Sequence, residues 1–148
     1  MPDNKQVIRD MEDALNRRDW VAYAARFADP VRWRKFPADR QVTRAAYLDI
    51  IQDIARTFPD WFVTIERLVA EDDWVAELAR VSGSHRAQPR TPHHGDLRGV
   101  EPTDKKIEVW QAHFWRLRDG IIVEHEPVRD DLGIFRQLGL VSTHLRQT

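Results

Sequence analysis

Residues 105–128, KKIEVWQAHFWRLRDGIIVEHEPV, decide the fold. Two runs rich in β-branched and aromatic residues, Lys105–Leu117 and Ile121–Val128, flank the turn Arg118-Asp119-Gly120. Glycine adopts the positive φ that a tight hairpin turn requires, and the flanking composition is typical of strands. The stretch therefore predicts two long antiparallel strands joined by a short hairpin turn.

Further strands precede this hairpin, and a short helix follows it. Trp61–Leu68 alternates between apolar and polar residues, and the acidic turn Glu71-Asp72-Asp73 separates it from a long strand at Trp74–His85. After the hairpin, Asp130–Leu138 predicts a short helix that ends at Gly139. The second half of the chain is thus a meander of antiparallel strands closed by one helix.

The first half of the chain is mainly helical. Apolar residues recur at helical spacing over Lys5–Phe27, with an interruption at Asp19, and Asp29-Pro30 is expected to end this segment. A second helix begins after Thr43, its expected N-cap, and ends at Phe58-Pro59-Asp60. Helices are therefore expected to precede the strands and to pack on one face of the sheet.

The remaining segments read as short connections. Val31–Arg34 predicts a short strand, Pro37–Arg40 a turn, and Gln88–Gly99 an exposed irregular loop rich in Pro, His and Gly. A long curved sheet covered by helices would enclose a cavity. The length of 148 residues fits a single α+β domain spanning residues 1–148.

Composition narrows the function classes. Apolar residues make up 42% of the chain and charged residues 32%, and Lys plus Arg (23) nearly equals Asp plus Glu (24), which argues against a clustered basic field for nucleic acid. The absence of cysteine excludes disulfides and thiolate catalysis. The polar N-terminus and the lack of a long apolar run predict a cytoplasmic protein that does not interact with membranes.

Several short motifs resemble those of SnoaL-like polyketide cyclases, often called ester cyclases. Over about Ala14–Leu140 they occur in the family's order and spacing: Phe58-Pro59-Asp60, Leu68-Val69-Ala70-Glu71, Val81-Ser82-Gly83-Ser84-His85, Gly95–Thr103, Arg116–His125, and Asp130 with Leu132-Gly133 and Gln137-Leu138-Gly139. The resemblance implies an NTF2-like cone-shaped barrel, with N-terminal helices on a strongly curved antiparallel sheet, and a homodimer formed through the outer sheet face. It also implies cofactor-free chemistry in a pocket inside the cone. The well-studied cyclases there close a ring by intramolecular aldol condensation, using an acid/base carboxylate and a nearby histidine.

Two departures from the family pattern bear on activity. The family's Trp-Asp after the last-strand histidine is replaced by Glu126-Pro127, so the acid/base carboxylate falls at or near Pro127, which cannot transfer protons. The chain also carries about eight additional residues between His85 and Gly95, including Gln88–His94. This insertion is expected either to cover the pocket or to be a longer loop.

Two histidines of the hairpin are the main catalytic candidates. His113 shares a strand face with Gln111 and Trp115, and it occupies the position of the family's pocket histidine. The alternative is a buried histidine bound to a backbone carbonyl. His125 belongs to the family's Glu-His pair, and depending on sheet curvature it faces the same cavity or only holds its strand in place.

Three other titratable residues have a structural alternative. Asp130 is the remaining carboxylate near the expected site, but an aspartate there is also a preferred helix cap. Glu77 and His85 share the parity of one strand face, so they form either an inner acid/base pair or part of a solvated surface.

The substrate-binding residues are expected to be mainly aromatic. Aromatic side chains suit polycyclic or conjugated ligands, although core packing is the commoner role of such residues. The candidates for substrate binding are Trp33, Phe36, Phe58, His85, Gln111 and Trp115. Trp110 has the opposite parity to His113 and is assigned to a dimer surface. His93-His94 is expected to lie in a solvated loop, with no metal site.

Two functions remain open at this stage. The first is a cofactor-free enzyme in which His113 or Asp130 removes a proton next to a carbonyl group, while His125 or Gln111 stabilises the enolate oxygen. Ring closure, isomerisation or elimination would follow. The second is a ligand-binding or interaction module without chemistry, which the proline at position 127 favours.

Overall fold

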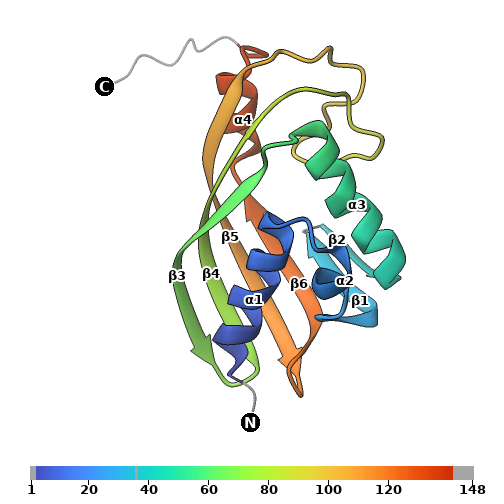
Figure 1. Ribbon diagram of the computed structural model, residues 1–148, viewed down its shortest axis with the longest axis vertical. Coiled ribbons are helices and arrows are strands. Elements are labelled where there is room, and N and C mark those ends of the chain that lie inside the picture. Colours follow the sequence, from blue (N-terminus) through green and yellow to red (C-terminus); the bar gives the residue numbers. More distant parts are fainter. Residues whose placement is uncertain (1–2, 36, 142–148) are drawn as a thin grey trace.

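The hairpin predicted at residues 105–128 forms the centre of the sheet (Figure 1). In the computed structural model, which describes residues 3–35 and 37–141, β5 (Lys106–Arg118) and β6 (Ile121–Arg129) pair antiparallel. Both turn residues have positive φ, 50° at Asp119 and 75° at Gly120, as a type I′ turn requires. The local sequence signal for this hairpin is therefore confirmed.

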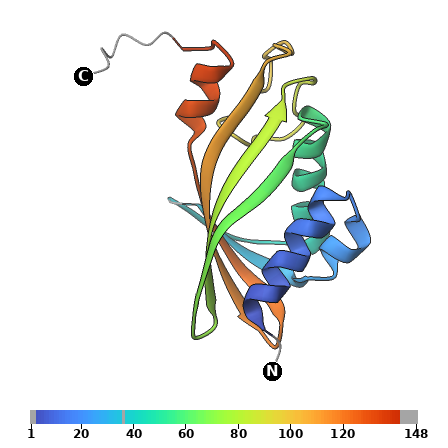
Figure 2. The same ribbon diagram turned by 60° about the vertical axis from the view of Figure 1, so that its left-hand side comes forward.

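The described strands form one six-stranded sheet in the order β2-β1-β6-β5-β4-β3. The other strands are β1 (Phe27–Lys35), β2 (Ala38–Val42), β3 (Phe62–Glu71) and β4 (Trp74–Ser84). The predicted α+β class is confirmed, and the sheet is curved but open, because its edge strands β2 and β3 do not pair with each other (Figure 2). It is not wholly antiparallel, since β1 and β6 run parallel.

The N-terminal half differs from the prediction in two places. The predicted helix is divided into α1 (Asn4–Asn16) and α2 (Trp20–Ala24), and Phe27 already belongs to β1. The predicted turn at Pro37–Arg40 instead contributes to β2, which pairs with β1. Pairing of β1 with the distant β6 overrides the local stop signal at Asp29-Pro30, because the register shifts between Phe27 and Arg32 and leaves the proline outside the ladder.

Two helices begin after capping residues that the sequence indicates. Thr43 caps α3 (Arg44–Thr57), and its hydroxyl oxygen accepts a hydrogen bond from the Ala46 N–H at 3.1 Å. Asp130 caps α4 (Asp131–Gln137) by accepting from the Gly133 N–H at 2.8 Å. Figure 2 shows α1, α2 and α3 on one side of the sheet, with α4 at its upper end. The inner sheet face and these three helices enclose the core.

A bulge in β6 brings its histidine to the inner face. Leu117 pairs with Ile122, and Arg116 pairs with Glu124, so one additional residue stands in β6 between these pairs. Ile122 and His125 consequently both face the helices, although they have opposite parity in the sequence. His125 thereby shares a face with His113. From the sequence alone, this shared position depended on the curvature of the sheet.

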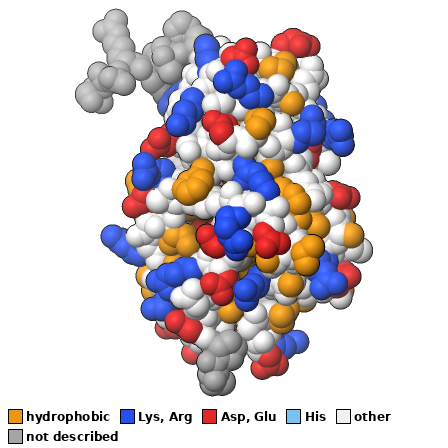
Figure 3. All heavy atoms as spheres, viewed as in Figure 1, with side chains coloured by type: hydrophobic (Ala, Val, Ile, Leu, Met, Phe, Trp, Pro, Cys, Tyr) orange, Lys and Arg blue, Asp and Glu red, His pale blue; other side chains and the backbone are white. Residues whose placement is uncertain are grey.

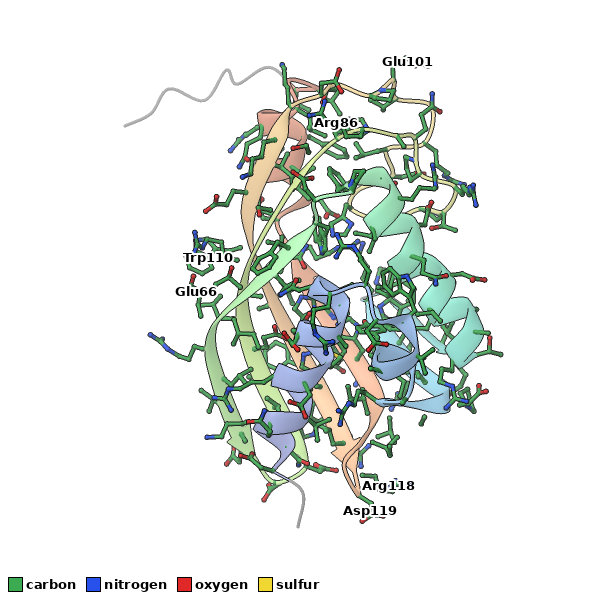
Figure 4. All side chains as sticks on the ribbon, viewed as in Figure 1. Glu66, Arg86, Glu101, Trp110, Arg118 and Asp119 are labelled. Atoms are coloured by element: carbon green, nitrogen blue, oxygen red, sulfur yellow. The ribbon has the colours of Figure 1, made fainter. Side chains whose placement is uncertain are left out.

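The outer sheet face carries both charged side chains and exposed apolar side chains. Trp110 and Glu66 project away from the helices (Figure 4), and Trp110 is 53% exposed. On the opposite, helix-bearing face seen in Figure 3, basic and acidic side chains of the described residues are interspersed. None of the helices described is long and apolar enough to cross a membrane. The cytoplasmic location stays a prediction.

Candidate functional site

A pocket lies between the inner sheet face and helices α1 and α3. It encloses about 630 Å³ of empty space, open solvent at its mouth included. Its walls are mainly apolar and aromatic, with a polar group along one side. The lining residues are Glu12, Leu15, Tyr23, Trp33, Tyr47, Ile50, Ile51, Ile54, Trp61, Val63, His94, Gln111, His113, Trp115, His125, Pro127 and Arg129.

A hydrogen-bonded histidine pair stands on β5 and β6. His113 Nδ1 and His125 Nε2 are 2.8 Å apart, and the other ring nitrogen of His125, Nδ1, lies 2.9 Å from the Tyr47 hydroxyl of α3. Register pairing of Trp115 with His125 stacks the two rings, with centroids 3.9 Å apart and planes 7° apart. The pair is therefore held on both sides by packed aromatic groups.

The polar chain continues through Gln111 into the inserted loop. His113 Nε2 lies 3.1 Å from Gln111 Oε1, and Gln111 Nε2 lies 3.0 Å from His94 Nε2. His94 Nδ1 is in turn 3.2 Å from His93 Nδ1. We call these six hydrogen-bonded side chains the imidazole wall: Tyr47, His125, His113, Gln111, His94 and His93.

The wall ends at the carboxylate of Asp53 on α3. Asp53 Oδ2 accepts hydrogen bonds from the Arg90 N–H at 2.8 Å, the Thr91 N–H at 2.9 Å and the Thr91 hydroxyl at 3.0 Å. Burial opposes its ionisation, but the hydrogen bonds from Thr91, Arg56 and Arg90 outweigh it and hold the pKa of Asp53 below its usual value. Asp53 therefore fixes the inserted loop against α3 as an ionised group.

Asp53 also sets the direction of the hydrogen bonds. His93 Nε2 lies 3.3 Å from Asp53 Oδ2, although the contact does not have hydrogen-bond geometry. A nitrogen lone pair facing an ionised carboxylate would be repelled, so this nitrogen carries the proton. Each neutral imidazole then donates toward Asp53 and accepts on its other side, and the Gln111 amide fits the same direction. At the far end the Tyr47 hydroxyl donates to His125 Nδ1. The wall thus assigns Nε2–H to His93, His113 and His125 and Nδ1–H to His94.

The wall is uncharged near neutral pH. Burial, followed by the nearby Arg129 charge, lowers the pKa of His113 to about 3. Burial likewise lowers the pKa of His93 to about 4, and it places the pKa values of His94 and His125 well below the usual histidine range. All four imidazoles are therefore available as bases.

A pair of buried carboxyl groups lies elsewhere in the cavity. Glu12 of α1 lines the pocket, and Glu77 of β4 accepts a hydrogen bond from Trp115 Nε1 at 2.7 Å. Burial raises the pKa of Glu77 to about 7 and, together with Glu77 itself, raises that of Glu12 well above the usual range. Glu12 Oε2 and Glu77 Oε1 are both buried without a hydrogen-bond partner among the described residues, and burial favours the protonated form of each carboxyl.

The comparisons with known proteins agree with this architecture. Residues 5–138 match the SnoaL-like polyketide cyclase family. The chain belongs to this family. A 47-residue stretch is 43% identical to the nogalonic acid methyl ester cyclase of Streptomyces nogalater, and the match covers 32% of this chain and 35% of that protein.

Solved structures show the SnoaL-like fold. AclR from Streptomyces galilaeus, described as a candidate hydroxylase, has a TM-score of 0.80 and 23% identity, over 97% of this chain and 89% of AclR. IdmH from Streptomyces antibioticus, described as a candidate polyketide cyclase, has a TM-score of 0.76 and 25% identity, over 93% of this chain and 99% of IdmH. The family and fold predicted from the sequence are confirmed.

The structure brings together five of the predicted site residues. His113, His125, Gln111, Trp33 and Trp115 all line the pocket of this SnoaL-like protein. Their shared position follows from the strand parity of β5, the bulge in β6 and the pairing of Trp33 with His125.

Four predicted residues do not join this group. Asp130 is exposed and caps α4, and the buried Phe58 packs against Trp61 outside the pocket lining. The buried His85 accepts a hydrogen bond from the Thr103 N–H at 3.2 Å through Nδ1 and is also outside the lining. Phe36 lies outside the described residues.

The sequence missed several members of the site. The prediction of a solvated His93-His94 is wrong, because both residues are only 2% exposed and belong to the imidazole wall. Glu12 had an available signal, since it interrupts the apolar stripe of α1 between Ile8 and Leu15. Among the residues that the structure describes, no group of three or more His, Asp or Glu side chains is arranged to hold a metal ion.

Pro127 lies within the SnoaL-like pocket, paired in register with His113. The position to which the resemblance assigns the acid/base carboxylate therefore faces the cavity but holds a group without a transferable proton. Among the titratable groups that line the cavity, the histidine pair and Glu12 are the best candidates to replace this acid/base carboxylate. Proton transfer here needs a different set of residues from the one that the resemblance implies.

Proposed function

We propose that this SnoaL-like protein is a cofactor-free enzyme that removes a proton next to a carbonyl group of a carbonyl-rich or polycyclic small molecule. The observation that carries the proposal is the His113–His125 pair, bonded at 2.8 Å inside an aromatic pocket. Membership of the family supports small-molecule chemistry of the cyclase or isomerase type.

The first step follows from the direction of the hydrogen bonds. A substrate carbonyl oxygen accepts a hydrogen bond from the Tyr47 hydroxyl, and His125 Nδ1 loses its donor and becomes free. This nitrogen takes a proton from the adjacent carbon, and the electron pair of the broken C–H bond passes to the enolate oxygen. Tyr47 stabilises that oxygen, and His113 accepts a strengthened hydrogen bond from the protonated His125.

The second step determines the product. The enolate carbon forms a bond to a second carbonyl carbon, whose oxygen receives the proton from His125, and a ring closes. Return of the proton to a different carbon gives isomerisation instead. Neither path changes the oxidation state of the substrate as a whole, so neither requires an electron acceptor.

The test follows hydrogen exchange in D₂O. Nogalonic acid methyl ester, the compound in the name of the Streptomyces nogalater relative, serves as the probe, and NMR measures loss of its hydrogens next to carbonyl groups. His125→Gln keeps a hydrogen-bonding side chain that cannot take a proton, and we expect the exchange rate to fall by about 10²-fold or more.

His85→Gln is the matched control, because it removes a buried imidazole outside the pocket. Melting temperatures of both variants verify that the fold is retained. An exchange rate unchanged in His125→Gln contradicts the assignment of His125 as the base. Binding of the probe to the wild type without any exchange supports a non-catalytic binding module instead.

The proposal includes a homodimer formed through the outer sheet face. Large apolar side chains there are strongly exposed: Phe62, Val69, Trp110, Phe114 and Val128, between 41% and 60%. Exposed apolar groups of this size on one sheet face are typical of an interface. Sedimentation should give twice the 17.4 kDa chain mass, and Trp110→Glu should give the monomer. A monomeric wild type contradicts the dimer.

A further inference from the structure

A second hollow adjoins the pocket and shares two residues with it. Trp33 and Arg129 line both cavities, and we call these two residues the neck. The second hollow is lined by Trp33, Lys35, Ala38, Arg40, Pro92 and Arg129. A ligand in the pocket that reaches toward this hollow must pass the neck.

Arg129 of the neck is a buried cation with unused donors. Its side chain is only 8% exposed, and no described residue accepts a hydrogen bond from its guanidinium in this structure. The nearest carboxylate oxygen, Asp131 Oδ1, lies 3.5 Å from Nε, and both atoms are buried without a hydrogen-bond partner. A guanidinium presents five donors and keeps its charge, so an acceptor at this place would be strongly favoured.

Trp33 supplies a second, independent donor at the same place. Its indole Nε1 is buried and has no acceptor among the described residues. Because Trp33 pairs with His125 in the parallel β1–β6 ladder, this donor lies on the strand next to the proposed base. Two buried donors without acceptors thus belong to the only two residues common to the two described hollows.

The charged side chains that line the second hollow are all positive. Its described lining contains Lys35, Arg40 and Arg129 and no acidic side chain. The Arg40 guanidinium lies 4.9 Å from the centre of a Trp33 ring. Burial and the charge of Arg129 lower the pKa of Lys35, even though Asp131 opposes this effect. Asp131, which is outside the lining, forms ion pairs at 3.5 Å with Arg129 and at 3.8 Å with Lys35 and offsets part of this charge. The positive charge that remains on the lining favours an anion.

We propose that the neck binds a carboxylate of the substrate, so that the substrate class is a ring-containing, carbonyl-rich acid rather than a neutral ester. This inference rests on the proposed function of the same pocket. A carboxylate oxygen pair matches the fork of the Arg129 guanidinium, and the Trp33 indole N–H donates to one of the same oxygens. Lys35 and Arg40 attract the acid to the entrance.

Binding of such an anion also activates the base. The Arg129 charge is among the causes that lower the pKa of His93, His94, His113 and His125. A carboxylate held at Arg129 offsets that charge and raises the affinity of these imidazoles for a proton. The enzyme then becomes a stronger base only when its substrate is bound.

The test compares two flat three-ring probes that differ in charge. Anthraquinone-2-carboxylate and anthraquinone-2-carboxamide are titrated at pH 7.5, and binding is followed by quenching of fluorescence from the pocket tryptophans, which include Trp61 and Trp115. We expect the wild type to bind the carboxylate about 10- to 100-fold more tightly, as for a charge-assisted hydrogen-bonded pair.

Three variants locate the effect. Arg129→Met removes the charge while keeping much of the volume, and it should abolish the preference for the carboxylate. Arg129→Lys retains a charge without the fork and should keep part of the preference. Arg80→Met, on the outer sheet face, is the matched control and should behave as the wild type.

Each outcome decides the inference. Equal binding of the two probes to the wild type, or a preference that persists in Arg129→Met, overturns the anionic substrate class. The hydrogen-exchange experiment with His125→Gln is independent of these titrations, so the proposed function can be retained even if the anionic substrate class is rejected. Failure of the wild type to bind either probe also overturns the inference of a ring-containing acid, while the exchange experiment still decides the proposed function.

Discussion

The imidazole wall and the Glu12–Glu77 pair show how one physical cause acts on two kinds of titratable group. Burial lowers the pKa of the histidines and raises that of the carboxyls. Both regions therefore lose charge near neutral pH, although the wall then holds neutral bases and the pair holds a proton. The pocket keeps an acid and a base in one cavity without an internal ion pair.

Arg129 differs from both regions, because an arginine keeps its charge even when it is buried. Among the described residues that line the pocket, it alone remains a permanent ion. Its charge adds to the burial of the wall in lowering the pKa of each histidine. The comparison therefore assigns proton transfer to the wall and ligand orientation to the neck.

The largest effect is expected at the outer end of the imidazole wall. Tyr47→Phe removes the hydroxyl that donates to His125 Nδ1 in the free protein and to the enolate oxygen during reaction. Loss of one such donor should lower the hydrogen-exchange rate by about 10²- to 10³-fold. Tyr23→Phe, which alters the other pocket tyrosine, is the control and should retain most of the rate.

The second prediction separates the two regions by their opposite pH dependence. The pKa of Glu77 is higher in the folded state, so its contribution to stability is lost as pH rises from about 4.5 to about 7. The pKa of His113 is lower in the folded state, so its contribution is lost as pH falls below 6.5 toward 3.

Glu77→Gln should remove only the first of these trends. Gln still accepts the Trp115 N–H, and relative to wild type its free energy of unfolding should increase by up to about 3 kcal/mol between pH 4.5 and pH 8. Urea unfolding at both pH values measures this change. A constant difference between Glu77→Gln and wild type would show that Glu77 titrates as an ordinary glutamate.

The smallest effect concerns the inner end of the wall. Asp53→Asn replaces the carboxylate that only accepts with an amide that also donates, so the direction of the hydrogen bonds is no longer fixed. Asp53 acts through the histidines, and we expect about a tenfold loss of exchange rate, with Asp49→Asn, one turn away on α3, unchanged.

Histidine ¹⁵N NMR gives a readout that a merely structural role would leave unchanged. Wild type should show Nε2–H at His93, His113 and His125 and Nδ1–H at His94, and Asp53→Asn should mix the two forms at His93 and His94. Identical histidine spectra for the two proteins would exclude Asp53 as the residue that orients the wall.

Local signals predicted the parts of the fold that local interactions determine. The hairpin turn at Asp119-Gly120 and the cap at Thr43 require only neighbouring residues, and both formed as expected. The parity of β5 placed Gln111, His113 and Trp115 on one face. The β1–β6 ladder could not be found in this way, because its partners are almost a hundred residues apart.

The candidate site was predictable to a similar extent. His113 follows from strand parity, but His125 reaches the same face only through the bulge in β6. His93 and His94 are buried because Asp53 binds the backbone at Arg90 and Thr91. This contact cannot be predicted from the periodicity of the sequence. The inserted loop is therefore part of the site, although its composition is typical of an exposed segment.

The parallel pairing of β1 with β6 has a consequence for how the pocket assembles. Trp33 meets His125 only when a segment near the start of the chain docks beside the last strand. Contacts of such large sequence separation form late, because closing the intervening chain costs entropy before any contact compensates for it. During synthesis, the binding site is therefore incomplete until β6 has left the ribosome.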